Sequence, residues 1–207
     1  MWPGCVEASV RAAGNAPVAR MLERVKLAEA NGYDTAWLAD ERFYREVYSC
    51  LTYFAQHTTR MKVGPCVTDP YTRHPALTAM AIATLDELSG GRAILGIGAG
   101  ISGFTELGVA RKKPARAIRE AIELIRMLLR GEKVTYDGEV IQFTEGKLSF
   151  APIRPEMPIY VASNGPIGQK MAGALAQGAI MEACGNVEEV RALRSVLDGG
   201  AKQAGRD

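Results

Sequence analysis

The chain has 207 residues, of which 47% are hydrophobic and 23% are charged, a balance typical of a globular protein and not of a disordered one. Lys and Arg number 25 against 23 Asp and Glu, so the formal charge of +2 argues against nucleic acid as a partner. The four cysteines are scattered without a C-x-x-C pair, and neither a leader pattern nor a run of about 18 apolar residues is found, so we expect a cytoplasmic protein with no membrane contact and no disulfide framework.

Along the first two thirds of the chain, short apolar runs alternate with amphipathic segments, the pattern of parallel β/α units. Strands are expected at residues 5–10, 35–39, 62–68 and 92–98, and helices at 17–30, 45–56, 75–88 and 114–130. Pro65 lacks the backbone N–H that a strand ladder needs, so it predicts a bulge in the third strand. In the fourth helix, the pairs Arg116/Glu120 and Arg119/Glu123 are expected on a solvated outer face.

From residue 131 the pattern changes, because Asp137-Gly138 lies between two β-rich runs and is typical of a hairpin turn. We interpret residues 131–157 as an insertion within a single domain that spans residues 1–207. The parallel pattern then resumes with strands at 158–162 and 178–182 and helices at 166–176 and 187–204. About six β/α units result, whereas a closed (β/α)8 barrel needs eight. Periodicity leaves two architectures open, a doubly wound open sheet and a barrel that stops before its seventh strand.

In both architectures ligands bind at the carboxyl ends of the parallel strands, so the residues that follow each apolar run are the candidates. They are Glu7, Asp40-Glu41, Thr68-Asp69, Gly98-Ala99-Gly100, Ser163-Asn164-Gly165 and Glu182. Glu7 and Asp40 end neighbouring strands and would converge, as a proton-transfer pair or as hydrogen-bond acceptors for a ligand. The alternatives are a helix N-cap for Asp40 and a satisfied polar residue in the barrel mouth for Glu7.

Two glycine-containing loops are candidates for binding an anion. The run Gly98-Ala99-Gly100-Ile101-Ser102-Gly103 matches G-x-G-x-x-G, but it follows the fourth strand and precedes no clear helix, which favours a tight turn over a dinucleotide site. Ser163-Asn164-Gly165-Pro166 predicts either an anion site at a helix start or an ordinary N-cap. His57 and His74 lack the spacing of a metal pair, and Cys66 is expected to be a packed thiol, so neither a metal site nor covalent catalysis is predicted.

Four stretches of the chain resemble the luciferase-like monooxygenase superfamily, in particular its methylenetetrahydromethanopterin reductases, which use coenzyme F420, an 8-hydroxy-5-deazaflavin. These stretches are Tyr33–Asp40, Thr68–Pro75, Ala81–Gly100 and Ile159–Pro166. The resemblance implies an α/β fold of the TIM (β/α)8-barrel type with an insertion after the fourth unit, and a chain without the family's last two β/α units. Because an opened barrel exposes two strand edges, we also expect a homodimer.

By this resemblance the protein is an oxidoreductase that transfers a hydride between F420 or a flavin and a small organic substrate. The alternatives are a monooxygenase that uses flavin mononucleotide (FMN), and a nonenzymatic flavin-binding or inactive barrel fragment. Two departures leave the substrate open. Glu41 stands where many relatives have His, and Ile101 stands where the reductase branch has an acid.

The resemblance also implies site residues. A non-prolyl cis peptide is expected at Cys66-Val67 against the middle of the cofactor ring, with Glu7 and Asp40 as the acids near the ring and the substrate. The cofactor contacts that it implies are Cys66, Val67, Thr68, Gly98, Gly100, Ser163, Asn164, Gly165 and Pro166.

Overall fold

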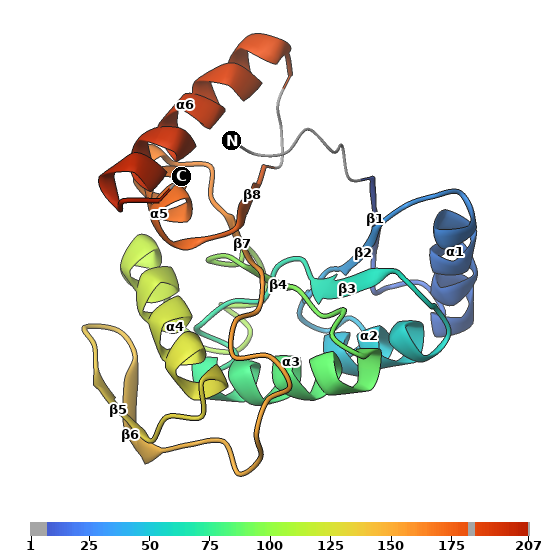
Figure 1. The fold of residues 1–207 in the computed structure, drawn as a ribbon, viewed down its shortest axis with the longest axis horizontal. Helices are drawn as coiled ribbons and strands as arrows, with labels where there is room; N and C mark the ends of the chain where they lie inside the picture. The colour runs from blue at the N-terminus through green and yellow to red at the C-terminus, as the bar shows by residue number, and fades with distance from the viewer. Residues whose placement is uncertain (1–7, 182–184, 207) are drawn as a thin grey trace.

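The computed structural model describes residues 8–181 and 185–206, with parallel strands at the centre and helices on the outside (Figure 1). Within these residues the parallel strands are β1 (Ser9–Ala12), β2 (Thr35–Leu38), β3 (Lys62–Pro65), β4 (Leu95–Ile97), β7 (Ile159–Ala162) and β8 (Gly178–Ile180). The helices are α1 (Val18–Ala30), α2 (Val47–Gln56), α3 (Pro75–Ser89), α4 (Pro114–Leu129), α5 (Pro166–Leu175) and α6 (Val187–Gln203). The antiparallel hairpin of β5 (Val134–Asp137) and β6 (Gln142–Gly146) confirms the predicted turn. In the described part of the chain, no helix is long and apolar enough to cross a membrane.

The order of the strands decides between the two architectures. In the described residues, the sheets β1-β2-β3 and β4-β7-β8 are joined by single parallel bridges between Val63 and Ala93 and between Thr68 and Ile97. Each parallel strand therefore lies beside the parallel strand that precedes it in the chain. A doubly wound sheet reverses this order at a switch point, whereas a (β/α) barrel does not. The barrel-type arrangement is confirmed.

Two aromatic side chains lie on the inner side of the curved strands. Trp37 of β2 and Tyr160 of β7 meet edge to face, with ring centroids 5.6 Å apart. A methyl group at Gly64 or Gly96 would approach Trp37 Cζ3 to 3.0 or 3.2 Å and would also collide with a backbone carbonyl of the adjacent strand. Glycine at these positions therefore leaves room for the indole ring and lets β3 and β4 approach closely.

The third strand, in which Pro65 predicts a bulge, ends at that residue. Regular pairing of β3 with β2 ends at Pro65, and the Cys66–Val67 peptide bond is cis, as the family resemblance implies. Pairing then continues with β4, because Thr68 N donates to Gly96 O at 3.0 Å and Gly98 N donates to Thr68 O at 2.9 Å. The cis bond therefore lies at the carboxyl end of β3, between the contact of Cys66 N with Leu38 O of β2 at 2.7 Å and the pairing of Thr68 with β4.

The first strand lies further along the chain than the sequence predicts. β1 pairs with β2 from Ser9 opposite Thr35 to Ala12 opposite Leu38. Its carboxyl end is therefore Ala12, whereas the sequence predicts a strand at residues 5–10. Glu7 lies outside the described residues. The residues around position 7 are mostly small or apolar, so pairing with β2 and not the sequence pattern sets the register of the strand.

The sequence predicts that the whole outer face of α4 is solvated, but part of this face is buried. Glu120 is only 3% exposed, and its carboxylate accepts the backbone N–H groups of Glu139, Val140 and Ile141, each at 2.9 Å. Burial by itself raises the pKa of this carboxyl, but the three donors and Arg116 outweigh burial and hold the pKa below its ordinary value. The prediction of a solvated Glu120 is wrong, because the hairpin turn folds back over α4 and covers it.

Candidate functional site

The carboxyl ends of β3, β4 and β7 meet at one small apolar surface. A methyl group at Gly98 would lie 2.8 Å from Val67 Cγ2 and 3.3 Å from the Cβ of Ala162, so the three segments approach closely because residue 98 has no side chain. Ser163 follows directly after Ala162. The structure thus brings Val67 and Gly98, two residues assigned to cofactor binding, together with Ala162, while the Ser163 side chain packs against Gly168 of α5.

The neighbours of Val67 differ in exposure. Cys66 is partly buried, whereas Thr68 is fully buried. The Thr68 hydroxyl has no hydrogen-bond partner among the described residues, although both backbone groups of Thr68 pair with β4. Thr68 therefore fastens the end of this segment to β4 through its backbone.

The loop after β4 wraps around an arginine. A methyl group at Gly100, where φ is +65°, would lie 2.8 Å from both Arg42 Nη2 and Phe104 Cζ, and Gly103, where φ is +74°, packs against the aliphatic stem of Arg42. No helix begins between Gly103 and Pro114 in this described segment. The interpretation as a turn at the barrel end is thus confirmed, and the dinucleotide alternative lacks the helix that it needs.

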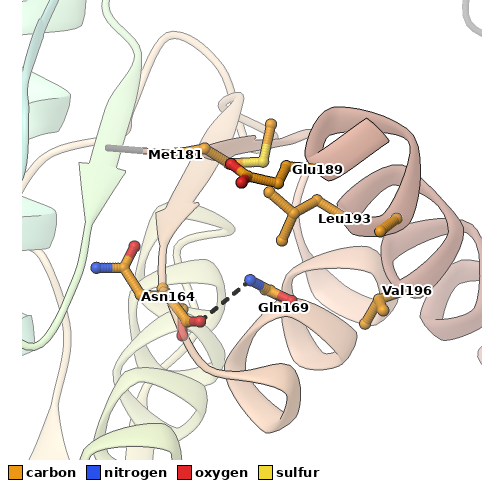
Figure 2. A pocket seen from close by; sticks show the side chains of 8 residues that line it. Asn164, Gln169, Met181, Glu189, Leu193 and Val196 are labelled. Carbon is orange, nitrogen blue, oxygen red and sulfur yellow. Dashed lines mark hydrogen bonds between the residues drawn. The ribbon is translucent and has the colours of Figure 1, made fainter. Parts of the chain in front are cut away.

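The loop before α5 opens onto a cavity of about 350 Å³ between α5, α6 and the end of β8 (Figure 2). The N-cap of α5 is Gly165, and no described side chain caps this helix, so the ordinary N-cap reading of Ser163 and Asn164 is wrong. Gln169 Nε2 instead donates to Asn164 O at 3.3 Å. The cavity is lined by Ser163, Asn164, Gln169, Met181, Glu189, Ala192, Leu193 and Val196. It combines polar groups at the start of α5 with an apolar wall from α6.

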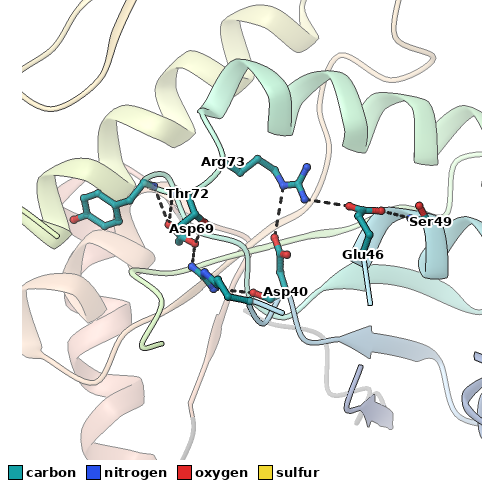
Figure 3. A network of polar contacts seen from close by, with 8 residues as sticks. Asp40, Glu46, Ser49, Asp69, Thr72 and Arg73 are labelled. Carbon is teal, nitrogen blue, oxygen red and sulfur yellow. Dashed lines mark hydrogen bonds and ion pairs between the residues drawn. The ribbon is translucent and has the colours of Figure 1, made fainter. Parts of the chain in front are cut away.

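Asp40 follows β2 and faces Arg73 from the loop after β3 (Figure 3). Arg73 Nε lies 3.7 Å from Asp40 Oδ2, and Arg73 Nη2 lies 3.1 Å from Glu46 Oε1. Glu46 also accepts the backbone N–H of Ser49 at 2.7 Å and is the N-cap of α2. The N-cap alternative for Asp40 is therefore wrong, and its carboxylate is left at the mouth beside a guanidinium.

Asp69, by contrast, serves the structure of its own loop. It is 1% exposed and accepts the backbone N–H groups of Tyr71 at 2.8 Å and Thr72 at 2.9 Å, as well as the Thr72 hydroxyl at 2.7 Å. Asp69 also forms an ion pair with Arg42, whose guanidinium lies 4.9 Å from the ring centroid of Phe104. Asp69 therefore joins the loops after β2 and β3, and its carboxylate is fully occupied.

Three residues of this mouth were not singled out from the sequence. Arg42 and Arg73 bind the carboxylates described above, and Arg73 lies 4.9 Å from the ring centroid of Tyr48. Tyr48 is buried in the first turn of α2, where burial and then the charge of Asp40 raise the pKa of its hydroxyl. Arg73 stands within the run Thr68–Pro75 that carries the family resemblance, which was the available signal. No sequence signal pointed to Tyr48, because its position in the helix is typical of a core residue.

His74 has a structural part in the same loop. Its Nδ1 accepts the backbone N–H of Ala76 at 3.2 Å and caps α3, while Nε2 lies 3.0 Å from Gln142 O of the hairpin. Among residues 8–181 and 185–206, no group of three or more His, Cys, Asp or Glu side chains is placed to hold a metal ion.

Comparison with known proteins identifies one family and relatives that share one enzyme name. The family model described as luciferase-like monooxygenase matches residues 3–207. The chain is 43% identical over 183 residues to 5,10-methylenetetrahydromethanopterin reductase of Archaeoglobus fulgidus, covering 88% of this chain and 54% of that protein. It is 41% identical over 192 residues to the enzyme of the same name from Methanolobus tindarius, covering 92% and 58%. The chain thus spans slightly more than half the length of these curated relatives.

A solved structure agrees with these sequence matches. The coenzyme F420-dependent tetrahydromethanopterin reductase of Methanopyrus kandleri superposes with a TM-score of 0.90 at 33% identity. The match covers 98% of this chain and 62% of that one.

Proposed function

Because the chain belongs to the luciferase-like monooxygenase family, we propose that it binds coenzyme F420 at the carboxyl ends of its parallel strands and takes part in hydride transfer to or from a small organic substrate. The observation that carries this proposal is the convergence of Val67, Gly98 and Ala162 at one surface, with Ser163, the next residue after Ala162, lining the cavity before α5. The solved relative that is named as a coenzyme F420-dependent tetrahydromethanopterin reductase supports F420 over FMN.

The residues present fit a planar ring with a polar side chain. Val67, Gly98 and Ala162 form a surface without any bulky side chain, and a methyl group at Gly98 would already crowd it. F420, when bound, supplies the carbon that gives or takes the hydride. The protein's part is then to hold the flat ring system against this surface and to exclude water from it.

The start of α5 suits the polar part of such a cofactor. With glycine at the N-cap and no described side chain bound there, the first backbone N–H groups of α5 are available to an anionic or hydroxyl group. Ser163 and Asn164 line the adjoining cavity and add a hydroxyl and an amide. We assign Ser163, Asn164, Gly165 and Pro166 to this contact.

Asp40 is the residue that we assign to the substrate. Its carboxylate lies at the mouth beside Arg73, where it can orient a substrate donor or hold a proton. Glu7, the second acid that the resemblance implies, lies outside the described residues, and the strand geometry that favoured it has been corrected above.

Further properties of the protein are part of the same proposal. The substrate would be a small molecule of the methylenetetrahydromethanopterin type, the substrate named for the relatives, and the protein would act in the cytoplasm. In the described residues, β1 and β8 each pair with a strand on one side only, which supports association of two copies. Light scattering of the purified chain would check the homodimer, and a stable monomer would contradict it.

Titration with F420 and, separately, with FMN tests the proposal, with binding followed by fluorescence. We expect F420 to bind, and replacement of the loop Ser163-Asn164-Gly165 to weaken binding roughly tenfold or more, equal to about 1.4 kcal/mol. Asn31→Ala is the control, because Asn31 ends α1 at the opposite side of the barrel. Preferential binding of FMN would favour the monooxygenase alternative, and binding of neither cofactor would favour an inactive barrel.

A further inference from the structure

Two buried hydrogen-bond donors beside Asp40 have no acceptor. Tyr48 is 8% exposed, and neither its hydroxyl nor Arg73 Nε has a hydrogen-bond partner among the described residues. A buried donor without an acceptor is costly, so each such group in a folded protein needs a reason. Both donors belong to the mouth of the barrel, and the stacking of Arg73 over the Tyr48 ring, 4.9 Å from the ring centroid, keeps them together.

Of Asp40, Glu46 and Asp69, only Asp40 has a side chain that accepts no hydrogen bond from the described residues. Each oxygen of Glu46 already accepts one hydrogen bond, one from Arg73 Nη2 and the other from the backbone N–H of Ser49. Asp69 is saturated by its own loop and by Arg42. The Asp40 side chain accepts no hydrogen bond within the described residues, and its Oδ2 lies 3.7 Å from Arg73 Nε. A small rotation of the Asp40 side chain would therefore give Arg73 Nε a hydrogen-bond acceptor.

The charge of Asp40 also acts on the Tyr48 hydroxyl. Burial raises the pKa of Tyr48 most, Asp40 raises it further, and Arg73 opposes them. The hydroxyl therefore stays protonated at any pH at which the protein works, and it can donate a hydrogen bond but not act as a base.

We propose that Tyr48 and Arg73 are positioning residues for Asp40, whose carboxylate accepts hydrogen bonds from the Tyr48 hydroxyl and from Arg73 Nε. Two donors on one carboxylate fix its orientation. Asp40 then presents an oriented carboxylate to the substrate. This last step rests on the proposed function, whereas the contact between Tyr48 and Asp40 does not.

Nuclear magnetic resonance of the chain with 13C at the tyrosine ζ carbon tests the contact without any cofactor. Tyr48→Phe identifies the Tyr48 signal by its loss. We expect Asp40→Asn to move this signal, because the charged acceptor of the phenol is removed, while Glu41→Gln, a neighbouring acid, leaves it in place. Asp40→Ala serves if the Asn variant does not fold. A Tyr48 signal at the same position in wild type and in the Asp40 variant would overturn the proposal.

Kinetics test the positioning role. With reduced F420 and methylenetetrahydromethanopterin, Tyr48→Phe should lower kcat about tenfold while the Kd for F420 is unchanged, and it should lower kcat no further when added to Asp40→Asn. Tyr53→Phe, on the exposed side of the same helix, is the control. A wild-type kcat in Tyr48→Phe would overturn the role. No turnover by the wild-type chain would count against the proposed function alone, and the resonance experiment would still decide the contact.

Discussion

Replacing Glu120 with Gln is expected to destabilise the protein by about 4 kcal/mol, because one carboxylate holds the whole hairpin turn. Glu120 Oε2 accepts two backbone N–H groups and Oε1 accepts a third, all at 2.9 Å. Glutamine keeps one acceptor oxygen and turns an NH2 group toward the remaining donor. One charge-assisted hydrogen bond, worth about 1.5–3 kcal/mol, is then lost, and the other two fall to the neutral value of about 0.5–1.5 kcal/mol.

Thermal melting and urea denaturation at neutral pH measure this loss. For a chain of this size, about 4 kcal/mol lowers Tm by about 8–16 °C. Glu123→Gln on the same helix is the matched control, because Glu123 is half-exposed and its one hydrogen bond, from the Tyr136 hydroxyl at 2.6 Å, can also form to an amide oxygen. We expect the control to cost less than about 1 kcal/mol. Equal losses from the two substitutions would refute the reasoning.

The hydrogen bonds to the Glu120 carboxylate also make the unfolding free energy depend on pH. The pKa of Glu120 is lower in the folded protein than its ordinary value of 4.5, so its contribution is fully present above that value. This contribution to the unfolding free energy is lost as the pH falls toward the pKa of Glu120 in the folded protein. The reason is that the unfolded chain takes up the proton at a higher pH than the folded chain does. The difference in unfolding free energy between wild type and Glu120→Gln should therefore shrink as the pH is lowered below 4.5. A difference that stays constant into the acid range would contradict the carboxylate anchor.

Three further substitutions test other parts of the molecule. Gly98→Ala should weaken F420 binding about tenfold in a fluorescence titration, because the added methyl crowds the proposed ring surface. Gly199→Ala, whose methyl would meet no described atom within 4 Å, should leave binding unchanged, and equal effects would contradict the assignment. Asp69→Asn should cost about 3 kcal/mol in urea denaturation, since it leaves a buried guanidinium without its partner, and a neutral result would remove the ion pair as a support. His74→Ala should cost about 1–2 kcal/mol by loss of the α3 cap and the hairpin contact, more than His57→Ala on the exposed end of α2.

Much of the fold follows from local signals. Apolar periodicity predicts the strands from residue 35 onward and the helices that follow them, and Pro75 and Gly90 mark the two ends of α3. Asp137-Gly138 predicts the hairpin, and Pro65 predicts the break in β3. Each of these patterns involves residues that are close together in the chain, so the sequence by itself is enough to predict the elements.

The site was predicted less completely, because its groups come from distant segments. The general rule for parallel strands placed Gly98 and Ser163 at strand ends, and the family resemblance alone pointed to Val67. The register of β1, which ends this strand at Ala12, depends on pairing with β2.

What only the tertiary structure decided is which polar groups find partners. Glu120 stands four residues from an arginine and reads as solvated, yet it binds a turn about twenty residues further along. Asp40 and Arg73 meet across two loops, and Tyr48 lies buried beside them. Sequence periodicity determines which face of an element is apolar, but a buried charge or donor is satisfied by whatever chain packs against it. That partner is set by the packing of the whole fold.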